Sequence, residues 1–495
     1  MIERPRHPGL VSTGPHPRSR AWVLPLVSAL LALAAAGAMG AALPTLRPPL
    51  HPILHAPRTE AAIRRALAES PHAGDCEQCH TTHGDDQPTV YPNALTSPDD
   101  NALCARCHGT PWSGGSFAGD VLYRGTGHGA STGMIWPGPE PGMRIEIDAA
   151  TKCLNCHDPH GWTDALGEIP QLAVAREERL CLACHDGSPA KTDIASELRK
   201  PYRHPTGDIS GRHTGPTESQ PADFGVSPLN NRHAECEDCH NPHVSRADGG
   251  SLDGTGDASK TTLGASRVLV QNGFAGQRPQ YTFIAGQDTL TAPDAEYQLC
   301  FKCHSSWTTQ PSGQTDLALE LNPANASFHP VEAAGRNPNI SAMAFAPGWS
   351  ASSLTRCGSC HGSDFGSTAG PHGSSNPFLL RRPSPASSAS RAMASDELCF
   401  SCHAYDVYAN PAALPGTRAA SRWNGPGVAN GHAEHVGAAQ VPCYACHVTH
   451  GSAQQPDLIA TGRNPGMIAY TSTASGGTCT TTCHAVESYT LNYAR

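Results

Sequence analysis

The sequence predicts a mostly irregular, loop-rich fold with short α-helices and little β-structure. Its 495 residues include 49 glycines and 44 prolines, which interrupt regular elements, and only 6% of the residues are aromatic. A chain of this composition cannot build large apolar cores from side chains alone. The 20 cysteines recur in similar short groups, so we expect something other than side chains to fill the interior.

The first 43 residues predict export. Four arginines lie within the first 20 residues, and an almost uninterrupted apolar run from Trp22 to Leu43 follows them, which is the order of a bacterial export signal. The small residues Ala36-Gly37-Ala38 suit a signal peptidase, yet roughly 20 apolar residues could also stay in a bilayer as an anchor to the inner membrane. Cleavage is the favoured interpretation. We expect the remaining chain in the periplasm or on the outer cell surface, with membrane contact only through this segment if it is retained.

The charge of the chain argues against nucleic-acid binding. The formal net charge is −9 and no basic run is present, whereas nucleic-acid-binding proteins gather Lys and Arg on one face.

All 20 cysteines belong to ten short motifs, each of which ends in His. Nine motifs have two residues between the cysteines, the tenth has three, and no cysteine is left over. The motifs are Cys76, Cys79 and His80; Cys104, Cys107 and His108; Cys153, Cys156 and His157; Cys181, Cys184 and His185; Cys236, Cys239 and His240; Cys300, Cys303 and His304; Cys357, Cys360 and His361; Cys399, Cys402 and His403; Cys443, Cys446 and His447; and Cys479, Cys483 and His484.

This spacing has a chemical reason. Two thiols about one turn apart can each add to one vinyl group of a haem, and the His after the second Cys can then ligate the iron. The sequence therefore predicts ten covalently bound haems c. Disulfides and structural zinc are the alternatives, but neither requires a His directly after every second cysteine.

A six-coordinate haem needs a second axial ligand, and histidine is the abundant candidate. Beyond the signal region 15 histidines lie outside the motifs, against five methionines. Two His ligands generally give a low potential, so we expect a low-potential set of haems.

Two sets of histidines are candidates for this second position. The first set follows a motif His by three residues, except for one member that an insertion displaces: His83, His160, His243, His450 and the displaced His372. Residues three apart on a helix point the same way, so this His should bind a different haem from its own motif. The second set lies ahead of the first motif of a pair or after the second: His72, His128, His204, His233, His329, His432 and His435. The 12 candidates exceed the ten positions, even without His51, His55 and His213. The tenth haem must take its second ligand from earlier in the chain or from a partner, because no His follows His484.

The ten motifs form five pairs, which predicts modules that extend the chain by repetition. After an export signal or anchor at 1–43, we expect dihaem modules 1 to 5 at 44–120, 121–200, 201–310, 311–410 and 411–495.

The stretches Cys153 to Gly161 and Cys236 to His243 resemble the doubled Cys-x-x-Cys-His family of multihaem cytochromes, and the resemblance spans about Pro71 to His484. It implies a multihaem cytochrome c fold, with short helices and loops organised around stacked bis-His haems, and electron transfer in periplasmic or outer-surface respiration. The displaced His372 and the wide tenth motif depart from the family pattern.

Between the motifs we expect mostly loop. Short helices are predicted at the attachment sites and over segments such as 171–180. The segment 267–286 contains Val268-Leu269-Val270, then Asn272-Gly273, then Tyr281-Thr282-Phe283-Ile284. This order predicts a small hairpin or, equally, a strand added to the third module. The segment 366–395 is rich in Ser, Pro and Gly and reads as a surface excursion without chemistry.

The favoured function is electron transfer from a membrane or periplasmic donor to another redox protein or an extracellular acceptor, as in anaerobic respiration. The alternative is a multihaem reductase of a small nitrogen or sulfur oxyanion, which needs one open haem site. All ten motifs end in His and the supply of histidines exceeds demand, which favours the carrier over the enzyme. The expected partners are redox proteins, and self-association or an outer-membrane barrel partner is a further interpretation.

Overall fold

The computed structural model divides into two units, Met1–Pro52 and Ile53–Arg495. The structure describes residues 72, 76–81, 96, 100–108, 127–130, 152–157, 159–160, 163–164, 167–168, 177–187, 190–207, 234–246, 260–287, 295–310, 313–364, 370–384, 387–424 and 431–491. The predicted signal, His83, His233, His51, His55 and His213 lie outside these residues. Within them, none of the helices has the length and apolar character that a membrane span needs.

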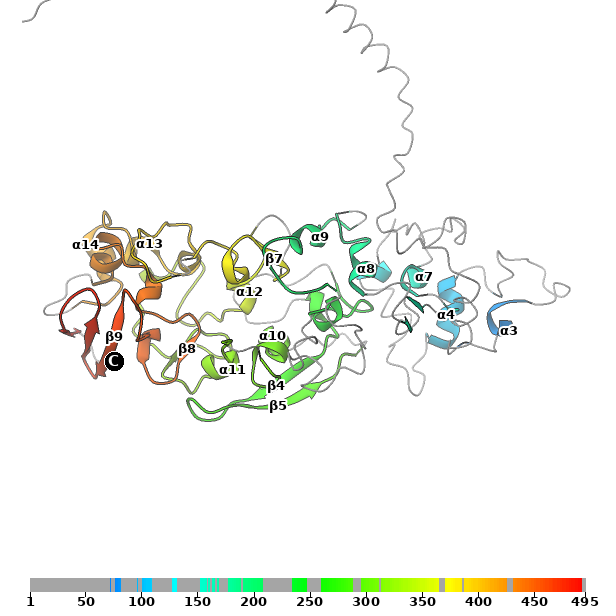
Figure 1. The fold of residues 1–495 in the computed structure, drawn as a ribbon, viewed down its shortest axis with the longest axis horizontal. Helices are drawn as coiled ribbons and strands as arrows, with labels where there is room; N and C mark the ends of the chain where they lie inside the picture. Colours follow the sequence, from blue (N-terminus) through cyan, green and yellow to red (C-terminus); the bar gives the residue numbers. More distant parts are fainter. Residues whose placement is uncertain are drawn as a thin grey trace, which may run out of the picture. The chain divides into compact units, whose positions relative to one another are not determined.

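Helices in the described residues are short (Figure 1). The α-helices are α3 (Cys76–Cys79), α4 (Asp100–His108), α6 (Gly127–Ala130), α7 (Lys152–Cys156), α8 (Glu177–Leu182), α9 (Ile194–Glu197), α10 (Tyr297–His304), α11 (Leu317–Glu320), α12 (Cys357–Cys360), α13 (Tyr405–Tyr408) and α14 (Pro415–Ala419). The 3₁₀ turns are η5 (Cys236–Asp238), η6 (Lys260–Thr262), η7 (Ala342–Ala344), η8 (Pro377–Leu379), η9 (Leu398–Ser401), η11 (Cys443–Ala445) and η12 (Pro456–Leu458), and η10 (Ala433–Ala438) is a π-helix.

The strands form small antiparallel sheets. They are β1 (Thr163–Asp164) with β2 (Gly167–Glu168), β3 (Tyr202–Arg203) with β7 (Gly373–Ser374), β4 (Arg267–Gln271) with β5 (Gln280–Ile284), β6 (Ser327–Phe328) with β8 (Gly451–Ser452), and a sheet of β9 (Met467–Thr473), β10 (Gly476–Thr481) and β11 (Glu487–Thr490) in the order β11-β10-β9. Loops with short helices dominate, as the Gly and Pro content predicts.

The predicted hairpin at 267–286 is present. Strand β4 pairs with β5 from Arg267 opposite Ile284 to Gln271 opposite Gln280, and α10 packs against β4 (Figure 1). Val268 is fully buried because it points from the hairpin into an apolar cluster with Phe301, Ala318, Leu321 and Val331.

The sheet β9-β10-β11 was not predicted. Its strands are rich in Thr, Ser and Gly, and β9 buries Met467 and Tyr470 without strict alternation. These two side chains pack with Cys479 in a small cluster. A third cluster joins Met393, Phe400, Ala409 and Val436. The two methionines Met393 and Met467 therefore serve as core residues here.

Candidate haem sites

Motif geometry is nearly constant from the first motif to the ninth. In seven of these motifs the His backbone N–H donates to the carbonyl of the first Cys, with N···O distances of 2.8 to 3.0 Å, as at His80 and Cys76. This bond closes one helical turn, which carries the two sulfurs to one side and the His directly after them. The local fold thus presents two thiols and one imidazole together, as the attachment of haem c requires.

The tenth motif is built differently. Cys479 lies on strand β10 and Cys483 lies in the bend after it. Thr481 Oγ1 accepts from the backbone N–H of Cys483 and of His484, both at 3.2 Å. Because an extended strand separates residues more than a helical turn does, the additional residue and this side-chain turn fold the chain back toward Cys479.

Each of the ten motif histidines faces a histidine from outside the motifs. The ring centroids are 6.0 to 6.5 Å apart in the pairs His80–His160, His108–His72, His157–His243, His185–His128, His240–His372, His304–His204, His361–His450, His403–His329, His447–His432 and His484–His435. Imidazole nitrogens bind metal ions at about 2 Å, so two imidazoles that share one iron have centroids roughly 6 Å apart. The spacing fits a haem iron between the rings of every pair.

The planes of the facing rings alternate along the chain. In the first motif of each pair the two planes are nearly parallel, with angles of 14°, 28°, 17°, 22° and 15°. In the second motif they are crossed, with angles of 80°, 70°, 57°, 60° and 55°. The repeat therefore sets ligand orientation as well as ligand identity.

The two histidine sets occupy different places in the repeat. Each described member of the first set faces the first motif His of the preceding module, as His160 faces His80 and His372 faces His240. Most members of the second set face the second motif His of their own module, as His72 faces His108. Sequence spacing alone did not assign these partners.

Neighbouring modules are joined at dipeptides that end in a first-set His. These clasp dipeptides are 159–160, 242–243, 371–372 and 449–450. The carbonyl of the first clasp residue accepts from Nδ1 of the second-set His in the preceding module: His72 to Pro159 at 3.2 Å, His128 to Pro242 at 2.9 Å, His204 to Pro371 at 2.6 Å, and His329 to Thr449. One dipeptide thus positions ligands at both motifs of the module before it.

At two of these clasps, the strands next to the two histidines pair with each other. Strand β3, directly before His204, pairs with β7, directly after His372, and β6 before His329 pairs with β8 after His450. The predicted excursion at 366–395 therefore needs correction. The sequence predicts a surface segment without chemistry, yet Gly373 and Ser374 are buried and His372 faces His240, because β7 pairs with β3 and holds the clasp dipeptide 371–372 beside His204.

Module 5 closes on itself. His432 faces His447, His435 faces His484, and His435 Nδ1 donates to the Gly431 carbonyl at 2.8 Å. The turn at 431–435 thus supplies the histidine that faces the first motif and the carbonyl that accepts from His435 Nδ1. In the other modules both come from the clasp dipeptide of the following module. The candidate for the second ligand of the tenth motif, His435, thus lies earlier in the same chain, which is one of the two sources that the sequence predicts.

Acidic residues before the second motif also join modules. Glu177 and Glu296 each precede the first Cys of a second motif by four residues. Their carboxylates accept from backbone N–H groups of the next module, at Glu237 and Gly358. Burial raises the pKa of Glu296, although the Gly358 N–H opposes that shift.

Two strained loops hold motif histidines and escaped the sequence reasoning. His361 Nδ1 donates to Phe378 O at 2.8 Å and His447 Nδ1 donates to Asp457 O at 2.9 Å. Phe378 and Asp457 have φ of 60° and 54°, a region that non-glycine residues rarely adopt. The repeated Pro-x-Leu at 377–379 and 456–458 was the available signal.

The side chains around the motifs fit a bound haem. None of the 20 cysteines forms a disulfide, and the Nε atoms of Arg246, Arg267 and Arg418 are buried without a hydrogen-bond partner in the described structure. Haem propionates are anions that guanidinium groups can bind. Burial and the facing His128 lower the pKa of His185 to about 4, so its imidazole is neutral, which is the form that ligates a metal.

Zinc fits less well. Among the described residues, one group of possible ligands brings Glu177, Cys181 and Cys236 within 4.8 Å of one another. A structural zinc site has four ligands, usually Cys and His, and this group offers three atoms, one from a carboxylate and two from cysteines of two different motifs.

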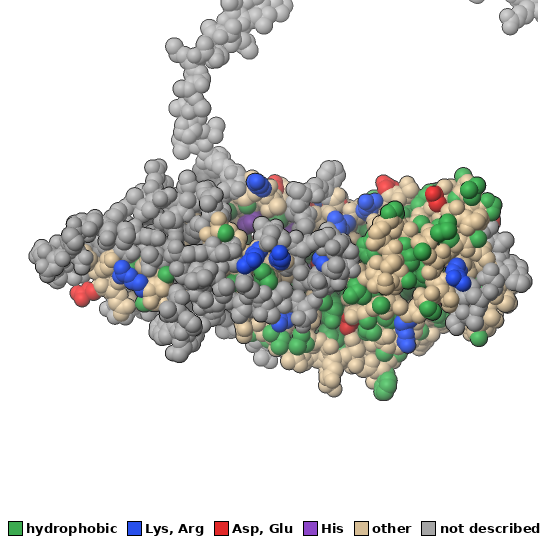
Figure 2. Space-filling view, turned by 180° about the vertical axis from the view of Figure 1, so that it is seen from behind, with side chains coloured by type: hydrophobic (Ala, Val, Ile, Leu, Met, Phe, Trp, Pro, Cys, Tyr) green, Lys and Arg blue, Asp and Glu red, His purple; other side chains and the backbone are tan. Residues whose placement is uncertain are grey.

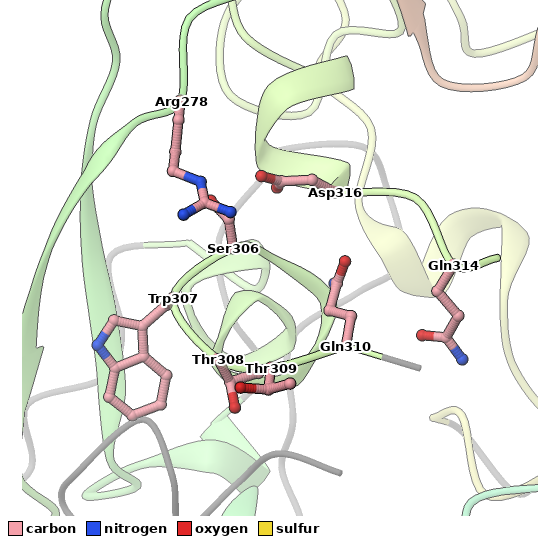
Figure 3. A pocket seen from close by; sticks show the side chains of 8 residues that line it. All are labelled: Arg278, Ser306, Trp307, Thr308, Thr309, Gln310, Gln314 and Asp316. Atoms are coloured by element: carbon pink, nitrogen blue, oxygen red, sulfur yellow. The ribbon is translucent and has the colours of Figure 1, made fainter. Parts of the chain in front are cut away.

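A pocket of about 450 Å³ opens beside the sixth motif (Figure 3). Arg278 and Asp316 point toward each other over Ser306, and Trp307 and Gln310 line the wall. No His or Cys lines it, so it is not a haem-ligating site. On the face shown in Figure 2, Lys and Arg side chains are scattered among hydrophobic and polar ones.

Comparison with known proteins yields one family. A protein-family model described as "Doubled CXXCH motif" matches residues 70–111, 148–190 and 352–407. Comparisons with curated proteins and with solved structures gave no match. The chain therefore carries the doubled CXXCH motif of multihaem c-type cytochromes, and that motif implies covalently bound haem c and a role in electron transfer.

Proposed function

We propose that the chain binds ten haems c, one at each motif, and conducts electrons along them. The observation that carries this proposal is the set of ten facing histidine pairs, each of which joins a motif His to a His from elsewhere. Haem supplies a one-electron couple when it is bound. The chain would hold it through the two cysteines of each motif and the two facing histidines, and the fold sets the orientation of those imidazoles.

Proximity of consecutive motifs supports conduction. The Cys181 thiol contacts Cys236, and Cys300 contacts Cys357, which raises the pKa of both Cys181 and Cys300. Burial and neighbouring thiols of the adjacent motif likewise raise the pKa of Cys360 to about 12 and of Cys446 to about 11. Sites this close on one chain suit electron transfer from haem to haem.

The fold follows from the same arrangement. The described apolar clusters are small, so stacked haems would supply most of the interior, and the clasps would fix each dihaem module to the next. Two imidazoles at every iron would leave no position for a substrate, which favours a carrier over the reductase.

Location and partners belong to the same proposal. The arginines and apolar run at 1–43 support export to the periplasm or outer surface, with membrane contact only if this segment is retained. Redox proteins would then be the donor and acceptor, and bis-His ligation supports low potentials suited to anaerobic respiration or extracellular electron transfer.

The mature, haem-loaded protein tests the proposal. Its intact mass should equal that of the processed or unprocessed chain plus ten haems, and neither nitrite nor cyanide should change its optical spectrum. A spectrum that changes with nitrite, together with nitrite consumption by the reduced protein, would instead establish an open site and the reductase. Free sulfhydryls or bound zinc would remove the proposal altogether.

A further inference from the structure

The second ring nitrogen of His450 contacts a carboxylate. Its Nδ1 lies 3.0 Å from Oε2 of Glu320, a carboxylate 130 residues away. At His128, His204, His435 and His484 the corresponding hydrogen bond goes to a backbone carbonyl. His361, which faces His450, also donates to a carbonyl, that of Phe378.

Glu320 is held firmly at this place. It ends helix α11, whose first turn is capped by Asp316 Oδ1 accepting from Leu319 N at 3.2 Å. The fully buried Asn325 donates from Nδ2 to the Glu320 carbonyl at 2.7 Å. On the clasp side, a Cβ on Gly451 would lie 1.9 Å from the same carbonyl, so the residue after His450 packs directly on α11.

The preceding clasp has the same architecture and a different charge arrangement. Gly373 packs on the carbonyl of Glu197, which ends helix α9, as Gly451 packs on Glu320. The Glu197 carboxylate, however, accepts from Lys200 Nζ at 2.7 Å, and Lys200 also contacts Asp364. The residue three positions after Glu320 is Pro323, so no lysine competes there and the carboxylate meets the imidazole.

We propose that Glu320 lowers the reduction potential of the haem attached at Cys357 and Cys360, below that of the haems whose histidines donate to carbonyls. The proposal rests on the proposed function, because it assumes a haem between His361 and His450. A carboxylate that accepts from a ligand N–H makes the imidazole more basic. A more basic ligand stabilises ferric over ferrous iron, so the haem is harder to reduce. Glu320 is a positioning residue that acts through His450, and it makes motif 7 a low-potential step in the path.

The test compares three haem-loaded proteins by spectroelectrochemical titration. Glu320→Gln keeps the shape and an acceptor oxygen but removes the charge. Asp316→Asn removes a charge from the same helix, keeps an acceptor for the cap, and serves as the control. In Glu320→Gln one tenth of the titration amplitude should move to higher potential, by about a tenfold change in the reduction equilibrium, which is 59 mV for a one-electron couple.

The outcomes separate this proposal from the proposed function. If Glu320→Gln holds ten haems and its titration matches that of the wild type, Glu320 does not set the reduction potential of this haem. The proposed conduction of electrons along the ten haems would still stand. An equal shift in Asp316→Asn would mean a general charge effect and would also overturn it. A wild-type protein without haem would overturn the proposed function first.

Discussion

At the scale of single residues, a buried ammonium group lies between two motifs. Lys302, within the sixth motif, is 1% exposed, and its Nζ donates to Ser266 Oγ at 2.7 Å and to the carbonyl of Asp238 in the fifth motif. A buried cation favours the reduced form of nearby haems, because reduction removes positive charge from the iron. The haems at motifs 5 and 6 would therefore be reduced more easily than the haem at motif 7.

Replacement of this lysine should move two potentials together. Lys302→Met keeps much of the side-chain volume and removes the charge, so we expect about two tenths of a potentiometric titration to shift to lower potential, while the haem content stays at the wild-type value. Lys260→Met, at a less buried lysine of the same module, is the matched control. A titration identical to that of the wild type would mean that Lys302 is purely structural.

A cluster of three charges joins modules 2 and 4 and gives a pH dependence. Lys200 Nζ contacts Glu197 at 2.7 Å and Asp364 at 2.6 Å. Burial acts to raise the pKa of Asp364, but hydrogen bonds from Lys200 and Ser375 outweigh it, and the pKa lies below the usual 3.8. A carboxyl with a lowered folded pKa stabilises the protein above its unfolded pKa, and that contribution is lost as the pH falls through the folded value.

Thermal unfolding measured against pH tests this cluster. Asp364→Asn should melt below the wild type at pH near 6, by an amount that corresponds to roughly 1 kcal/mol for a partly buried pair. The difference should shrink as the pH falls below 3.8, because the unfolded chain then takes up a proton at this carboxyl before the folded protein does. A difference that stays constant down to about pH 2 would contradict the assignment.

The sequence predicts which histidines are candidate ligands better than it predicts how they pair. The cysteine spacing and the surplus histidines identified all 20 residues of the ten facing pairs. Which rings face each other was not predictable, because partners such as His240 and His372 lie in different modules and the chain between them varies in length. The carboxylates Glu177, Glu296 and Glu320 were missed for the same reason, since they act across module boundaries.

At the scale of elements, the clasp requires glycine after its histidine in two described cases. A Cβ on Gly373 would lie 1.8 Å from the Glu197 carbonyl oxygen, which is far inside van der Waals contact. Any side chain here must push β7 away from α9 and carry His372 with it.

Substitution of this glycine should therefore open one haem. Gly373→Ala is expected to turn one haem of ten high-spin, because His372 can no longer face His240. Gly335→Ala, where an added Cβ meets nothing within 4 Å, should leave the spectrum unchanged. Low-spin iron throughout Gly373→Ala would show that the clasp tolerates the displacement.

The two larger sheets differ in how clearly the sequence predicts them. The hairpin β4-β5 has β-branched and aromatic residues on both sides of Asn272-Gly273, which are strong local signals. The β9-β10-β11 sheet has Gly476 and Gly477 and many threonines in place of apolar alternation, and it is held together by contacts such as the 2.9 Å hydrogen bond between Tyr470 and Tyr489. Tertiary packing, which local patterns do not encode, decided that element.

At the scale of the whole molecule, a repeated module with small apolar clusters should depend on its cofactors for stability. With haems absent, the facing imidazoles and the 20 thiols lose the group that joins them. Chain produced without haem attachment should therefore show no cooperative thermal transition by circular dichroism, whereas the mature protein should. A cooperative melt of the apoprotein would mean that the side chains alone build a sufficient core.

The most direct test of the ten facing pairs is electron paramagnetic resonance of the oxidised, mature protein. Nearly parallel imidazole planes split the iron d orbitals more than crossed planes do, so the five parallel pairs and the five crossed pairs should give two classes of low-spin signal in equal amounts. The crossed class should have the larger maximum g value. A single class, or a substantial high-spin fraction, would contradict the assignment of a histidine pair to every haem.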